Sequence, residues 1–190
     1  MKGQGLLYNN LGSYHPDLWR GDKNQEDNDL SVDYLKKSLA IKEELNDFSR
    51  SITTLTQLAE LSHEVGDYQM GLSFLTRALK LTESTIDLEK EITVLGEMSV
   101  FFLKINDAKK AMSYGIKAYE IARKMDSQFY ISAISENVIN ASFAQNEFKR
   151  AYEFLMIKKT SEEAVFTETR QKNRDELLIQ YETEKKEKKG

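Results

Sequence analysis

The chain contains no cysteine and only one proline, Pro16, among its 190 residues. The absence of cysteine excludes disulfides, thiolate zinc sites and cysteine nucleophiles. It leaves the cellular compartment open, because reducing and oxidising compartments both tolerate such a chain. The scarcity of proline, together with abundant Leu, Glu, Lys and Ala, favours helices over sheets. We therefore expect an all-α protein whose first helix ends or kinks near the proline.

An excess of basic residues is also lacking. The chain has 27 Lys and Arg against 31 Asp and Glu, which gives a net charge of −4 and no general positive field for phosphate backbones. No stretch approaches the ~20 apolar residues of a membrane span, and the opening MKGQGLLYNNLG lacks the apolar core of a signal peptide. The sequence predicts no nucleic-acid partner, and membrane attachment only through segments outside this chain.

Catalytic and cofactor-binding motifs are missing as well. His15 and His63 are the only histidines, and HEVGD at 63–67 lacks the second histidine of a zinc-protease helix. The glycine-rich loops that bind nucleotides and the GxSxG motif of serine hydrolases are absent from the sequence. We expect a protein that is not an enzyme and that uses no metal and no cofactor.

The sequence does contain a tandem repeat. A period of about forty residues predicts a solenoid, in which each unit buries its apolar face against its neighbours. Within a unit, apolar residues at helical spacing are interrupted by a turn, such as Gly66 and Asp67, which predicts two antiparallel helices. A small residue in each unit is expected to let the two helices of a pair approach closely. These small residues are Ser31, Gly71, Ala111 and Ala151.

The helix pairs resemble tetratricopeptide repeats of the long-unit variety. The resemblance rests on the small-x-x-x-large spacing of Gly71 to Leu75 and of Ala151 to Leu155, and on the GDY turn at 66–68. It implies a right-handed superhelical solenoid of antiparallel helix pairs. The predicted pairs cover residues 1–163 and span about 4–46, 48–86, 88–126 and 128–162, followed by a separate capping and linker helix over 164–190.

The C-terminal segment narrows the resemblance. ELLIQYETEKKEKK at 176–189 resembles the helix that closes the repeat arrays of Bacteroidetes sensor histidine kinases and helix-turn-helix regulators. In those proteins it leads into a coiled coil or a membrane helix, so the resemblance implies the repeat region of a longer signalling protein, with a homodimer through this helix as one candidate arrangement. Phe166, Leu177 and Leu178 are predicted to cap the fourth pair before a charged end projects.

The candidate binding site is the concave face, which in the tetratricopeptide family is lined by the first helix of each pair. The lysine, asparagine and arginine clamp of chaperone-binding members has no counterpart here, which argues against recognition of a terminal carboxylate. The same polar side chains could instead serve only to keep the surface soluble. The expected residues are Asn9, Asn10, Ser13, Thr53, Thr56, Gln57, Glu60, His63, Thr93, Glu97, Val100, Lys104, Glu136, Asn137, Asn140 and Phe143.

Three functions fit these observations. The first is a noncatalytic sensor or interaction region of a bacterial signal-transduction regulator, located in the periplasm if the regulator is anchored in the membrane. The second is a cytoplasmic peptide-responsive domain that controls gene expression. The third is a freestanding scaffold that joins two proteins. All three share a protein or peptide ligand, whose identity the sequence does not reveal.

Overall fold

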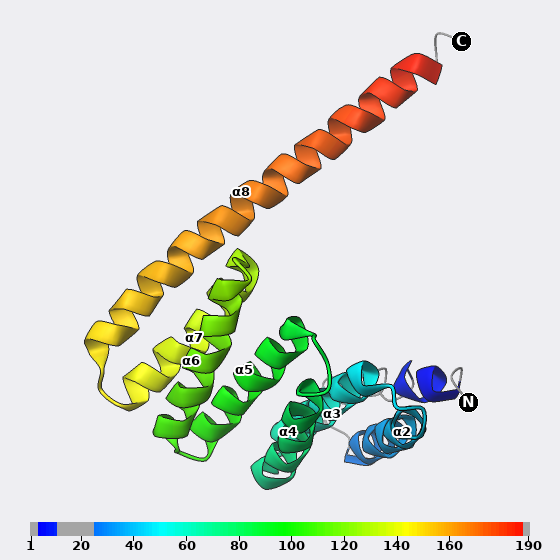
Figure 1. Ribbon diagram of the computed structural model, residues 1–190, viewed down its shortest axis with the longest axis vertical. Helices are drawn as coiled ribbons and strands as arrows, with labels where there is room; N and C mark the ends of the chain where they lie inside the picture. Colours follow the sequence, from blue (N-terminus) through cyan, green and yellow to red (C-terminus); the bar gives the residue numbers. More distant parts are fainter. Residues whose placement is uncertain (1–3, 11–24, 188–190) are drawn as a thin grey trace.

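The computed structural model describes residues 4–10 and 25–187, and all regular structure in these ranges is α-helical (Figure 1). The all-α prediction is confirmed. Pro16 and the helix end expected near it lie outside the described residues. No described helix is both long enough and apolar enough to span a membrane. After a short helical segment at 4–10, the helices are α2 (Gln25–Glu44), α3 (Phe48–Glu64), α4 (Tyr68–Thr82), α5 (Leu88–Lys104), α6 (Ala108–Lys124), α7 (Gln128–Ala144) and α8 (Phe148–Glu187).

The turns between helices use the same local chemistry repeatedly. Gly66, with φ of 81°, ends α3, and the next N–H group, that of Asp67, donates back to the Ser62 carbonyl at 2.8 Å. The Asp67 carboxylate then accepts from the N–H of Met70 and so caps α4. The turn predicted at this point is confirmed. The other residues with positive φ are Asn46, Asn106, Asp126 and Asn146, each of which follows a helix.

The four small residues of the repeat are buried, and at Gly71 the tightest contact is with the following helix pair. A Cβ atom added to Gly71 would lie 2.0 Å from Cε1 of Phe101. Phe101 is fully buried in α5, so Gly71 makes room for a side chain of the following helix pair. The small residue therefore sets the spacing between units at this position.

The pattern of helix contacts gives the array its curvature. The first helices of successive pairs touch, because α3 packs against α5 and α5 against α7. Among the described helices, the backbones of the second members lie farther apart, since neither α4 with α6 nor α6 with α8 has a close backbone approach. Their long side chains still meet, as where the Tyr119 ring of α6 lies 4.9 Å from the Phe154 ring of α8. First helices that pack side by side and second helices that diverge form an arc with α3, α5 and α7 on its inner side (Figure 1). We call the exposed surface of these three helices the inner face.

The expected break between the fourth pair and a separate closing helix is absent. Instead, α8 is one continuous helix of 40 residues (Figure 1). No glycine or proline occurs between residues 148 and 187 to stop it. The hydroxyl of Thr160, near the predicted boundary, donates to the Met156 carbonyl one turn earlier and caps no new helix. The prediction of a ninth helix beginning near residue 164 was therefore wrong.

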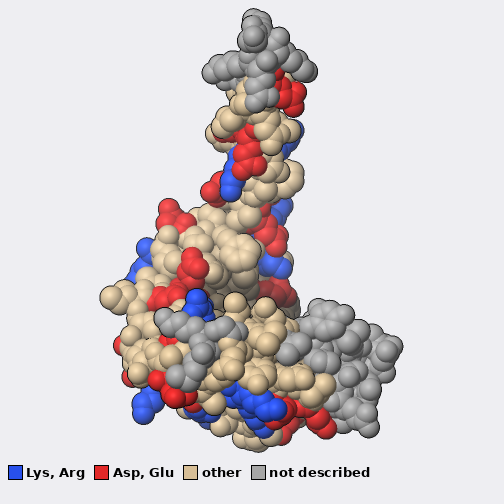
Figure 2. Space-filling model, turned by 90° about the vertical axis from the view of Figure 1, so that its right-hand side faces the viewer, with Lys and Arg blue, Asp and Glu red and all other residues tan. Residues whose placement is uncertain are grey.

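The apolar residues expected to cap the fourth pair are exposed. Phe166, Leu177 and Leu178 have 67%, 66% and 55% of their surface accessible. The reason is geometric: α7 has 17 residues, and the straight course of α8 carries these side chains past the end of α7 or away from it. The second half of α8 projects from the body as a column with both signs of charge along it (Figure 2).

Candidate functional site

Two hydrogen bonds tie the helices of the inner face together. The Lys90 ammonium of α5 donates to the Thr53 hydroxyl of α3 at 3.0 Å. The Asn137 amide of α7 donates to the backbone carbonyl of Gly96 in α5 at 3.0 Å. Each bond joins a side chain to the neighbouring first helix, so the register between units is fixed on the surface where binding was predicted. The inner face is thus a defined polar surface.

Two carboxylates meet near the middle of this surface. Burial, together with the smaller effect of the neighbouring Glu60 carboxylate of α3, raises the pKa of Glu97 to about 7. Near neutral pH the pair therefore holds a proton for part of the time. A cation placed between the two side chains would favour the fully ionised pair. Two neighbouring carboxylates attract a positive group more strongly than an anion.

His63 contributes to packing more than to the surface. Its ring centroid lies 5.7 Å from that of Tyr68 and 5.5 Å from that of Phe101. Burial, followed by the Lys104 ammonium, lowers its pKa, so the neutral ring is favoured. Its Nε2 atom is buried without a hydrogen-bond partner in the described part of the chain. His63 is half-buried and its ring packs against two aromatic side chains, and its part in binding stays a prediction.

Asn9 is also committed to a structural contact. Its side-chain oxygen accepts from the Lys42 ammonium at 2.6 Å, and Lys42 also donates to the Thr54 hydroxyl at 2.6 Å. Burial lowers the pKa of Lys42 to about 8. This network joins the segment 4–10 to α2 and α3, so Asn9 is not available as a ligand contact. Thr56 is buried as well, and Ser13 lies outside the described residues.

The remaining predicted residues divide by exposure. Glu136 and Phe143 are exposed but turn toward α8. Glu136 pairs with Lys158 at 2.6 Å, and the Phe143 ring meets the Phe148 ring edge to face at a centroid distance of 6.1 Å. Gln57, Val100 and Asn137 are partly buried, as Glu97 is. The exposed members are Asn10, Thr53, Glu60, Thr93, Lys104 and Asn140.

Lys90 is a residue of the inner face that sequence reasoning missed. A signal for it existed, because Arg50 occupies the same place in the preceding unit, three residues after the capping aspartate. A basic side chain at this point can reach back across the face, and Lys90 does so. Among the described residues, no group of three or more His, Asp or Glu gathers in a way that could hold a metal ion.

The sequence matches no protein-family model and no curated protein. Solved structures do resemble the fold. A Rap protein complexed with Competence and Sporulation Factor aligns with a TM-score of 0.64 and 16% identity, over 70% of this chain and 38% of that one. A kinesin light chain from Podosopora anserina with nearly identical TPR-like repeats aligns with a TM-score of 0.62 and 14% identity, over 81% of this chain and 76% of that one.

A third structure, BtubC (BKLC) from P. vanneervenii, aligns with a TM-score of 0.56 and 14% identity, over 86% of this chain and 74% of that one. The chain spans well under half of the Rap protein's length but most of the length of the other two. Identities this low support a shared fold alone. Together with the buried small residues, the capped turns and the paired helices, these similarities show that the chain is an all-α solenoid of tetratricopeptide-like repeats.

Proposed function

We propose that the chain is a noncatalytic protein-binding module whose inner face, formed by α3, α5 and α7, takes an extended peptide segment. The arc of first helices supports this function, because it presents one continuous polar surface held in register by side chains of the protein itself. The Rap protein of similar fold is complexed with a factor, which is a binding function on the same architecture.

The pair Glu60 and Glu97 defines the chemistry of the ligand. A partly buried carboxyl with a raised pKa beside a second carboxylate is stabilised when a cation binds between them. We propose that the segment presents a lysine or arginine side chain at this point. Lys90 and Lys104 lie toward the ends of the same helix, α5, where they can meet carboxylate or carbonyl groups of the segment.

We place this module in a signal-transduction regulator, as its sensory or interaction region. The projecting α8, whose C-terminal residues resemble the closing helix of bacterial sensor proteins, supports that role. The likeness to a Rap protein favours the alternative of a peptide-responsive regulator over a freestanding scaffold. In both cases the ligand binds the inner face, so one experiment tests the shared step.

Selection from a random heptapeptide library on the immobilised chain tests the proposal. We expect enriched sequences to carry Lys or Arg, and the Glu60→Gln/Glu97→Gln double variant to weaken their binding at least tenfold, because two carboxylate contacts to a cation are lost. Isothermal titration calorimetry would measure the affinity. The Glu120→Gln variant, which changes an exposed glutamate of the outer helix α6, serves as the control and should bind as the wild type does.

Binding to the ionised form of Glu97 should also release a proton near neutral pH. The heat of binding should then differ between buffers of different ionisation enthalpy, and the difference should vanish in Glu97→Gln. Enriched peptides that lack basic residues, or that bind the double variant as tightly as the wild type, would show that the inner face is not the site.

A further inference from the structure

One side of α8 carries an exposed apolar stripe that runs along most of the helix. At 3.6 residues per turn its members fall on a single side, within about 60° of a common line. The opposite side carries Ala151, Phe154 and Ser161, which are buried against the body. The stripe therefore lies on the side of α8 away from these buried contacts, and Met156 and Phe166 at its edges also line pockets with residues of α7. Its members are Tyr152, Leu155, Met156, Phe166, Leu177 and Tyr181, with 63%, 51%, 44%, 67%, 66% and 62% of their surface exposed.

The repeat itself indicates that part of this surface is a contact surface. By the forty-residue period, Leu155 corresponds to Leu75 two units earlier and to Leu35 three units earlier, while the third unit has Gly115 at this position. Leu35 and Leu75 belong to the hydrophobic core and are 1% and 0% exposed, whereas 51% of Leu155 is exposed. A leucine that is buried in the first and second units is thus exposed at the same position of the fourth. Such a contiguous apolar surface on a charged helix marks an association site.

The order of apolar and charged residues along the stripe bears on how two copies of this helix pair. Two apolar ends, around Tyr152 and around Tyr181, flank a central part that is acidic at Glu163 and basic at Arg170. Reversed about a point between residues 166 and 167, this order brings the apolar ends together and one pair of opposite charges together, and it also brings the like charges of Lys159 and Arg174 together. Tyr152 then meets Tyr181, Met156 meets Leu177, and Glu163 meets Arg170, because the members of each pair are equally distant from that point.

We propose that two copies of this chain associate through their α8 helices in antiparallel orientation, with Phe166 beside the two-fold axis. A parallel pair would place Glu163 against Glu163 and Arg170 against Arg170, which like charges oppose. In the antiparallel pair each of these contacts joins opposite charges, and the two-fold symmetry makes it occur twice.

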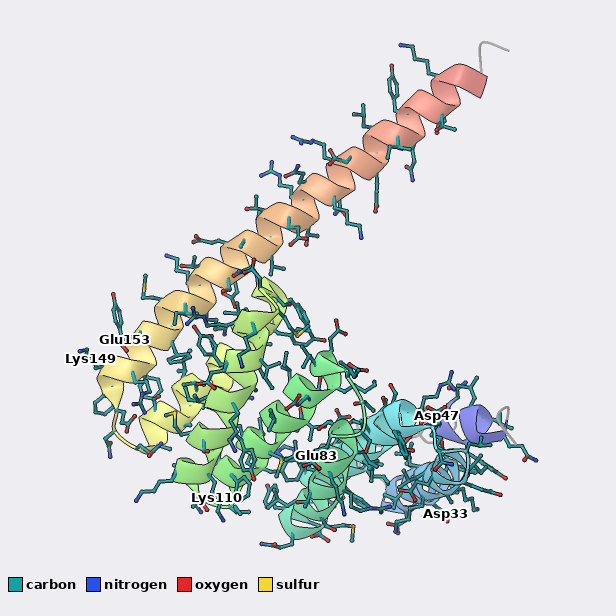
Figure 3. The ribbon with its side chains drawn as sticks, viewed as in Figure 1. Asp33, Asp47, Glu83, Lys110, Lys149 and Glu153 are labelled. Carbon is teal, nitrogen blue, oxygen red and sulfur yellow. The ribbon has the colours of Figure 1, made fainter. Side chains whose placement is uncertain are left out.

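The bodies of the two copies do not obstruct this arrangement. Figure 3 shows Lys149 and Glu153 on the side of α8 that turns away from α7, and their ion pair, with a separation of 4.0 Å, borders the stripe. Because α7 covers the opposite side of α8, each body lies outside the pair. Antiparallel packing places the two bodies at opposite ends of a helix pair about 60 Å long.

Disulfide trapping tests the orientation in a chain that has no cysteine of its own. The variants Tyr152→Cys and Tyr181→Cys are purified separately, mixed and oxidised. We expect a disulfide between the two different variants, since only antiparallel helices bring these positions within the 4.4–6.8 Å Cα separation, roughly, that a disulfide requires. Disulfides of Tyr152→Cys with itself as the main product would indicate a parallel pair and overturn the proposal.

Charge reversal tests the interface without trapping. Sedimentation equilibrium of the full 190-residue chain should show a dimer, and Arg170→Glu should raise its dissociation constant by at least about tenfold, because two attractive contacts become repulsive. The Arg170→Glu/Glu163→Arg double variant should restore the affinity. Lys109→Glu, the same charge change on exposed α6, should leave it unchanged. A wild-type chain that stays monomeric at every soluble concentration would overturn the proposal.

Discussion

Replacing Gly71 with alanine should destabilise the fold by about 1–3 kcal/mol, although alanine is the better helix former. The added methyl group would lie 2.0 Å from Cε1 and 2.6 Å from Cζ of Phe101. Phe101 is fully buried, and its ring meets that of His63 at a tilt and that of Tyr68 edge to face, so it cannot move without disturbing both neighbours. Urea unfolding followed by circular dichroism would measure the loss.

Gly115 supplies a matched control for this substitution. It lies inside helix α6 and is buried, but a Cβ there would lie 3.2 Å from the Ser99 hydroxyl and 3.2 Å from a Val138 methyl group. Small shifts of those groups would relieve such contacts. The gain in helix propensity of about 1 kcal/mol should then leave Gly115→Ala as stable as the wild type or more so. Equal effects of the two substitutions would show that the Gly71 contact with Phe101 does not set the spacing between units.

Replacing Glu97 with glutamine should stabilise the protein above pH 7 and have little effect below pH 4.5. The folded protein holds the proton of Glu97 to about pH 7, whereas a glutamate ordinarily loses it near 4.5. Between these values the folded state binds more protons than the unfolded state, so stability falls as the pH rises. Glutamine carries no charge at any pH and removes this loss, which amounts to at most about 3 kcal/mol above pH 7.

Thermal unfolding of wild type and variant from pH 4 to pH 8 would measure this effect. Glu60→Gln should recover only part of the gain, because burial contributes more to the raised pKa of Glu97 than its acidic neighbour does. Glu120→Gln on the outer helix should keep the pH dependence of the wild type. Parallel stability curves for wild type and Glu97→Gln across this range would contradict the placement of Glu97 in a partly buried acidic pair.

The sequence was sufficient to predict the parts of the fold that depend on local chemistry. The turn at Gly66 and Asp67 needs a left-handed residue followed by a helix cap, and both residue types are recognisable without a structure. The course of α8 could not be placed in the same way. The new helix was expected because the repeat period ends near residue 164. A helix ends where residues such as glycine or proline interrupt it, and none of these occurs near residue 164.

The inner face was predicted from helical periodicity. Periodicity shows on which side of a helix a residue lies, but it does not show how deeply the side chain is buried. His63 and Thr56 have the right phase, yet the first packs between aromatic rings and the second is buried. The raised pKa of Glu97 depends on how closely α3 approaches α5, which no residue pattern in either helix reveals. Asn9 could not be placed from periodicity either, because its side-chain oxygen accepts a hydrogen bond from Lys42, thirty-three residues away in the sequence.

The unbroken course of α8 gives the molecule a lever arm. The N-terminal half of α8 packs against α7, and no break in the helix would let it bend when this half rotates. From Thr169 to Glu187 the arm extends about 27 Å, at 1.5 Å per residue. A tilt of about 10° at the base, which a small change in the curvature of the arc would produce, therefore sweeps the tip through roughly 5 Å. A change in the curvature of the repeat array would thus appear as a displacement of the C-terminal end of α8.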